Sequence, residues 1–173
     1  SICSATVNVF DEVAPNAICM DITVPLDDDG TVTVDPSQVD NGSNDACGIA
    51  LLSLGDATFD CSMLGDTIMG MLVEDVNGNQ SYCTTVITLV DETAPIALCQ
   101  DVNIQLDQHG EASTTAQAVD NGSNDACGIS SLTLNQTAFD CSHYGANSVI
   151  LTVRDVNGNS STCNATVTGE DPI

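Results

Sequence analysis

Hydrophobic and polar residues alternate over short stretches of this chain, and a period of two residues predicts β-strands. Val, Ile, Leu and Thr dominate these stretches, and turn signals such as Asp-Asp-Asp-Gly and Asn-Gly separate them. No stretch shows the 3.6-residue period of an amphipathic helix. In the first half of the chain the predicted strands are Ala17–Leu26, Thr31–Val34, Gly48–Leu54, Asp66–Val73 and Ser81–Val90.

The pattern repeats after 80 residues. Residues 11–90 align with residues 91–170 without a gap, and 37 of the 80 aligned positions are identical. Cys3–Phe10 aligns with Cys83–Val90, the end of a repeat. We therefore predict module 1 at 11–90 and module 2 at 91–170, preceded at 1–10 by the last strand of a further module or by a strand exchanged between subunits, and followed at 171–173 by the start of the next junction.

Short strands at intervals of about ten residues in an 80-residue unit are typical of a seven-strand β-sandwich. The predicted fold is all-β: tandem immunoglobulin-like β-sandwich modules of about 80 residues, with two disulfides in each. The chain has no Trp, so the usual core tryptophan of immunoglobulin domains is missing. Because the core of so small a module is limited, we expect the disulfides to contribute much of its stability.

The charge of the chain excludes two classes of partner. There are 25 acidic residues and a single Lys or Arg, Arg154, which gives a formal net charge of -24. Nucleic acids and anionic lipids need Lys and Arg to displace their counterions, so we expect no nucleic-acid partner. No apolar run reaches transmembrane length, so we also expect no membrane insertion. A hydrophobic content of 42% argues against disorder.

Nine cysteines without CxxC or zinc-ligand spacing predict structural disulfides, and hence an extracellular protein at a cell surface or in a secreted fibre. Four cysteines in a module allow three pairings. The first and last strands of a sandwich lie side by side, and a short loop joins the two middle cysteines. We therefore predict the pairs Cys19–Cys83, Cys47–Cys61, Cys99–Cys163 and Cys127–Cys141.

Cys3 remains without a partner in this scheme. Since it occupies the same repeat position as Cys83, it would pair with a preceding module, or alternatively form an intermolecular bridge.

Three acidic clusters recur in both modules, and the sandwich topology predicts that they meet at one pole of each module. Carboxylates, Asn amides and turn carbonyls together favour calcium. The alternative is that these residues only form turns, in which Asp, Asn and Gly are common. The predicted calcium ligands at the module junctions are Asp11, Glu12, Asp40, Asp45, Asp75 and Asn77 for module 1, and Asp91, Glu92, Asp120, Asp125, Asp155 and Asn157 for module 2.

These motifs resemble those of the hyalin-repeat family and related bacterial immunoglobulin-like surface repeats. The resemblance lies in Asp-x-Thr-Ala-Pro at 91–95, Asp-Ala-Cys-Gly at 125–128 and Asp-x-x-Gly-Asn at 155–159, and it covers essentially the whole chain. It implies an extracellular sandwich with a role in adhesion or fibre building. The linker is also similar to the calcium junctions of cadherin-like tandem arrays.

The resulting functional hypothesis is an extracellular, calcium-stabilised structural repeat protein that forms a rigid rod or fibre, such as a filament or an adhesin stalk. Its partners would be neighbouring copies or modules of the same protein, and possible host or cell-surface ligands. The alternative is a cell-surface adhesion module that binds carbohydrate or protein. Phe59 and Phe139 recur at one repeat position, which favours core packing over a ligand site.

We expect no enzymatic activity, because His109 and His143 have no counterpart in module 1 and belong to no nucleophile–base or zinc pattern. Among six Asn-x-Ser/Thr sequons, Asn135 and Asn164 lie outside the predicted cation loops. They are the candidates for glycosylation in an organism that glycosylates.

Overall fold

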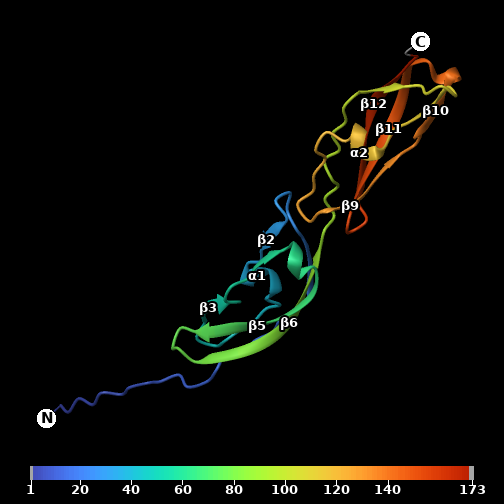
Figure 1. Cartoon of the computed structure of the whole chain (residues 1–173). Helices are drawn as coiled ribbons and strands as arrows, with labels where there is room; N and C mark the ends of the chain where they lie inside the picture. Colours follow the sequence, from blue (N-terminus) through green and yellow to red (C-terminus); the bar gives the residue numbers. More distant parts are fainter. Residues whose placement is uncertain (1, 172–173) are drawn as a thin grey trace. The chain divides into compact units, whose positions relative to one another are not determined.

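The computed structural model describes residues 2–171. Two compact units are present, one built mainly from residues up to 90 and the other mainly from residues beyond 90 (Figure 1). Strands dominate both units, and each unit contains one four-stranded and one two-stranded sheet. The architecture is therefore the expected all-β sandwich, present twice.

In module 1 the larger sheet has the strand order β1-β6-β5-β3, and the smaller sheet pairs β2 with β4. β1 runs parallel to β6, whereas the other pairs are antiparallel. A one-turn helix α1 and a 3-10 turn η1 join the strands. The elements are β1 Ile22–Pro25, β2 Thr31–Thr33, α1 Pro36–Val39, β3 Ile49–Ser53, β4 Thr58–Asp60, η1 Cys61–Met63, β5 Gly65–Asp75 and β6 Gln80–Val90.

Module 2 repeats this topology with the orders β7-β12-β11-β9 and β10-β8. The β7–β12 pair is parallel, like β1–β6. The elements are β7 Val102–Gln105, β8 Glu111–Ser113, α2 Ala116–Val119, β9 Ile129–Leu134, β10 Ala138–Asp140, η2 Cys141–His143, β11 Gly145–Asp155 and β12 Ser160–Glu170.

The core lies between the two sheets of each module and follows from the alternation along the long strands. In module 1, Met71 and Val73 of β5 and Ile87 and Leu89 of β6 are almost completely buried, while the residues between them face outward. The smaller sheet contributes Phe59, which is 4% exposed, and Phe139 at the same place in module 2 is 3% exposed. The prediction that both phenylalanines pack in the core is confirmed.

The sequence overestimated the strands at one point and missed short elements elsewhere. Each module has six strands, not seven, and only Ile22–Pro25 of the predicted strand Ala17–Leu26 forms a regular ladder. The short strand β4 was missed. The turn α1 was also missed, because four residues are too few to show a helical period, although Asp35 caps it and Pro36 begins it.

Each module has two poles, which we call the first and the second pole and define by the turns that lie there. The first pole holds the β5–β6 or β11–β12 turn and the loop before β3 or β9, since Ile49 pairs with Asp75. The second pole holds the opposite ends of the same strands, where Gly65 pairs with Leu89, and the 3-10 turn that precedes β5 or β11. The strand β5 has 11 residues, and at a rise of about 3.3 Å per residue it separates the poles by roughly 33 Å.

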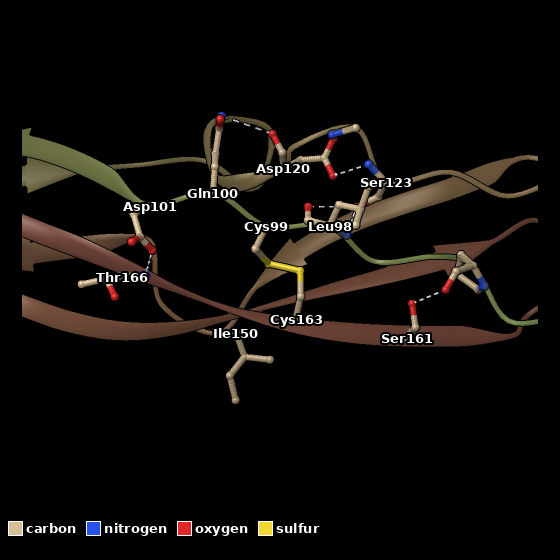
Figure 2. The surroundings of a disulfide bond; sticks show 12 residues. Leu98, Cys99, Gln100, Asp101, Asp120, Ser123, Ile150, Ser161, Cys163 and Thr166 are labelled. Carbon is tan, nitrogen blue, oxygen red and sulfur yellow. Dashed lines mark hydrogen bonds between the residues drawn. A yellow bond between two sulfur atoms is a disulfide. The ribbon is translucent and has the colours of Figure 1, made fainter.

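Two of the predicted disulfides are confirmed. Cys19 and Cys83 are bonded with a Cα–Cα distance of 5.7 Å, and Cys99 and Cys163 with 5.8 Å. Figure 2 shows the second bridge, which ties the segment before β7 to β12. The side-by-side placement of the first and last strands thus fixes both pairs.

The predictions Cys47–Cys61 and Cys127–Cys141 are wrong for this structure, because Cys47 and Cys141 are free and exposed thiols. The physical reason is the path of the chain. β3 starts at the first pole and pairs with β5, after which the chain crosses to the smaller sheet and β4 delivers Cys61 to the second pole. The two cysteines that are close in sequence therefore end at opposite poles.

Within the described part of the chain, residues 2–10 belong to no strand, and their side chains, including the free thiol of Cys3, are exposed. Whether this segment completes a neighbouring module or exchanges between subunits stays a prediction. Of the predicted junction 171–173, only Asp171 lies within the described residues. None of the helices in that part of the chain is long and apolar enough to cross a bilayer.

Candidate metal centre

Asp155 organises the turn at the first pole of module 2. It ends β11, its side chain is only 1% exposed, and one carboxylate oxygen accepts hydrogen bonds from the backbone N–H groups of Asn157, Gly158 and Asn159 at 2.9, 2.6 and 2.8 Å. The other oxygen accepts from the Asn159 side-chain amide at 2.8 Å. A buried carboxylate is tolerated here because the turn supplies its donors.

The linker that enters module 2 is tied to this turn. The amide of Asn159 also donates to the backbone carbonyl of Asp91, at 3.1 Å. The Asp91 side chain is thereby held next to the turn, with one oxygen accepting from the N–H of Thr93 at 3.0 Å. Asn159 therefore acts as a clip between the end of the β-hairpin and the incoming chain.

Asp125, in the loop before β9, completes a group of three carboxylates. Its Oδ1 accepts from the N–H groups of Cys127 and Gly128, both at 2.9 Å. Asp91, Asp125 and Asp155 each offer an oxygen that lies within 4.8 Å of the other two. We call these three residues the module 2 triad.

One oxygen of the module 2 triad is left without a partner. Oδ2 of Asp91 is buried from solvent and has no hydrogen-bond partner in the structure. Three carboxylates at this separation repel each other, and an unsatisfied buried oxygen adds a desolvation cost. A bound cation would remove both costs, and oxygen-only ligands fit a hard ion such as Ca²⁺.

Module 1 builds the same turn and the same clip. Asp75, 1% exposed, accepts from the N–H groups of Asn77 and Asn79 at 2.8 and 2.9 Å, and the Asn79 amide donates to Asp75 at 2.7 Å and to the Asp11 carbonyl at 3.2 Å. Burial opposes ionisation of Asp75, but the hydrogen bonds from Asn79 and Asn77 outweigh it and hold the pKa of Asp75 below its ordinary value.

The ligand group of module 1 nevertheless differs from that of module 2. Here the three groups within 4.8 Å of one another are the carboxylates of Asp11 and Asp45 and the thiol of Cys47. A hydrogen bond to the Asp11 carboxylate is the main cause that raises the pKa of the Cys47 thiol, with further contributions from the negative charges of Asp11, Asp45 and Asp75. The free thiol thus engages one of the two carboxylates of this group.

Half of the predicted module 2 ligands lie outside the triad. Glu92 and Asn157 are exposed, and Asp120 shapes the loop instead (Figure 2). Its carboxylate accepts from the N–H groups of Ser123 and Gly122 at 3.1 and 3.3 Å. Burial opposes ionisation of Asp120, and these hydrogen bonds lower its pKa. In module 1 the predicted ligands that lie outside the corresponding group of three are Glu12, Asp40, Asp75 and Asn77.

Three residues of the first poles were missed in the sequence analysis. Asn79 and Asn159, which clip the linker, were not among the predicted site residues, and Cys47 was assigned to a disulfide rather than to the first-pole group. The signal for the asparagines was available, because the Asp-Val-Asn-Gly-Asn segment recurs unchanged. No sequence signal distinguishes Cys47 from Cys127, since their flanking residues are identical.

The remaining candidates have local roles or stay open. His143 caps η2 together with Asp140, their Nδ1 and Oδ1 atoms being 2.9 Å apart, which agrees with the expected surface turn. Asn135 and Asn164 are exposed, and their glycosylation remains a prediction.

Comparison with known proteins identifies no sequence relative. No family model matches the chain, and no curated protein matches it either, so the hyalin-repeat resemblance has no support from these comparisons.

Among solved structures, the chain is similar to extracellular repeats 1–2 of human protocadherin-24, with 11% identity, a TM-score of 0.44, and coverage of 94% of this chain and 100% of that one. It is also similar to repeats 1–2 of human mucin-like protocadherin, with 12% identity, a TM-score of 0.39, and coverage of 91% and 98%. Extracellular domains 1–4 of protocadherin gamma B7 give 11% identity, a TM-score of 0.41, and coverage of 92% and 51%. At these values the likeness assigns no role to any residue of this chain.

Proposed function

We propose that the chain is part of an extracellular structural protein whose repeated modules are stabilised by calcium at their first poles and assemble into a stiff rod or fibre. The observation that carries this proposal is the module 2 triad, in which Oδ2 of Asp91 is buried without a partner beside two further carboxylates. A cation would satisfy the unpaired oxygen of Asp91 and offset the repulsion among the three carboxylates.

Calcium fits better than other common metals. The triad offers carboxylate oxygen atoms only, which suit a hard ion with a flexible coordination sphere. Extracellular calcium modules work with dissociation constants on the order of 10⁻⁴–10⁻³ M. Two disulfides of 64-residue span support an oxidising, extracellular location.

A structural role is supported by the repetition of the linker clip. The linker clip made by Asn79 in module 1 recurs as Asn159 in module 2, with the same donor and acceptor atoms. A site that holds the incoming linker in every module serves to stiffen a series of modules. A binding site for a unique ligand would instead be expected in one module only.

Calcium titration by isothermal calorimetry, combined with thermal melting in calcium and in chelator, tests the proposal. Calcium at about 100 times its dissociation constant should stabilise the binding module by about 2.7 kcal/mol. Asp91→Asn and Asp125→Asn should abolish most of the shift in melting temperature. Glu111→Gln, which removes one charge from the second pole of the same module, should retain it.

The proposal fails if the wild-type melting temperature is the same in calcium and in chelator, or if Glu111→Gln reduces the shift as much as Asp125→Asn does. The second result would mean that calcium only screens the net charge. Magnesium at the same concentration is a further control, because it demands a tighter octahedral site and should stabilise less.

A further inference from the structure

The free cysteines Cys47 and Cys141 lie at opposite poles of the module fold. Cys47 precedes β3 at the first pole, where the N–H of Val76 donates to the carbonyl of Gly48. Cys141 begins η2 at the second pole, directly after β10. A disulfide needs Cα atoms within about 7 Å, and the strands separate the two poles of a module by roughly 33 Å. Within any one module, a cysteine at the repeat position of Cys47 therefore cannot bond to one at the repeat position of Cys141.

Both positions are nevertheless able to form disulfides. Cys61, the counterpart of Cys141, and Cys127, the counterpart of Cys47, are disulfide-bonded in the structure. Each position is thus found once bonded and once free among the described residues. The two free thiols are one first-pole cysteine and one second-pole cysteine, the combination that a head-to-tail link requires.

The surroundings of Cys141 leave its sulfur accessible. The thiol borders a hollow of about 300 Å³, which Leu106, Asp107 and His109 also line, and it donates a weak hydrogen bond to the carbonyl of Gly110 at 3.7 Å. Gly110 has a φ of +76°, and a Cβ at this position would lie within 2.4 Å of the sulfur. The absent side chain therefore keeps space open beside the thiol.

The charges at the first pole disfavour a link between two first poles. Cys47 is surrounded by the acidic groups Asp11, Asp45 and Asp75, so two first poles would repel each other. A link between a first pole and a second pole avoids the contact between two such clusters.

We propose that Cys141 of one copy of this chain forms a disulfide with Cys47 of a second copy. The link is heterologous, because it leaves Cys47 of the first copy and Cys141 of the second free to react again. Repetition therefore produces a linear series of copies rather than a closed pair. This inference does not rest on calcium binding.

The oxidant is a low-molecular-weight disulfide such as oxidised glutathione. The thiolate of one cysteine attacks a sulfur of the oxidant, which forms a mixed disulfide and releases one glutathione thiol. The second cysteine thiolate then displaces the other glutathione. In total two protein thiols and one oxidised glutathione give one protein disulfide and two reduced glutathione molecules.

The test uses the full chain carrying Cys3→Ser, so that the third free thiol does not contribute. After incubation with oxidised glutathione, nonreducing gel electrophoresis should show a ladder of multiples that a reductant returns to monomer. Peptide mass spectrometry should identify Cys47 joined to Cys141, with the Cys19–Cys83 and Cys99–Cys163 bridges unchanged.

Two further variants separate the link from symmetric pairing. In the Cys3→Ser chain, adding Cys47→Ser alone or Cys141→Ser alone should leave the protein monomeric, whereas a mixture of these two variants should give dimers and nothing longer. Dimers formed by either variant by itself would overturn the proposal. Cys3→Ser monomers that carry glutathione on both Cys47 and Cys141, or that join these two cysteines within one chain, would overturn it as well.

Discussion

Asp155 shows how one side chain can serve both the fold and a binding site. The sequence predicted it as a calcium ligand, and the structure shows that its carboxylate accepts three backbone N–H groups and one side-chain amide. The turn residues could be predicted because they recur unchanged at 75–79 and 155–159. Which carboxylates meet depends on loop conformation, and for this reason Glu92 was predicted as a ligand although it lies outside the triad.

The raised pKa of Cys47 leads to a prediction about its reactivity. The thiolate is the nucleophile, and a pKa raised by the Asp11 carboxylate keeps Cys47 protonated at neutral pH. The rate of alkylation by iodoacetamide should therefore be low at pH 7–8 and rise as the pH approaches the folded pKa, which lies above the ordinary value of 9.0.

Asp11→Asn should lower this pKa and speed alkylation of Cys47 several-fold at pH 8, as measured by peptide mass spectrometry over time. Cys3 in the same sample is the internal control. Equal rates for Cys47 in the wild type and in the variant would show that Asp11 does not control the thiol.

At the scale of elements, the parallel pairing of the first and last strands determines which cysteines meet. β7 lies beside β12, and the bridge between Cys99 and Cys163 follows from this neighbourhood. The prediction for Cys47 and Cys61 was wrong, because a short separation in sequence was taken to mean a short distance in space. The crossing between sheets after β3 carries no hydrophobic pattern that would have revealed it.

Removal of the Cys99–Cys163 bridge should destabilise module 2 strongly. The bridge spans 64 residues and restricts the conformations of the unfolded chain. Without this restriction, the free energy of unfolding should fall by roughly 4 kcal/mol. The double variant Cys99→Ala/Cys163→Ala should show this cost in urea unfolding, while Cys3→Ala should leave stability unchanged. A loss below about 1 kcal/mol would show that strand pairing alone holds the module closed.

At the scale of the whole molecule, the net charge of -24 acts against compaction. A single Arg balances 25 acidic residues, so repulsion extends over much of the surface. Since the Debye length shrinks from about 30 Å at 0.01 M salt to about 10 Å at 0.1 M, monovalent salt should weaken this repulsion.

Thermal melting in chelator should therefore shift upward by several degrees between 0.01 M and about 0.5 M sodium chloride. Because the chelator removes calcium, this shift in melting temperature reports only the screening of charge by sodium chloride. The matched measurement is calcium chloride at equal ionic strength, which should add a further shift if the triad binds the ion. A melting temperature that falls with sodium chloride would indicate that attractive ion pairs, not repulsion, dominate.

The long-span bridges also set how each module responds to mechanical load. The chain enters through β1 or β7 and leaves through the parallel strand β6 or β12, so a pull along the backbone shears this pair of strands. The disulfides Cys19–Cys83 and Cys99–Cys163 transmit the force directly. The residues between the two cysteines of each bridge therefore cannot be extended by the pull. Under tension, each module can therefore lengthen only through the segments outside its bridge while the bonds remain oxidised.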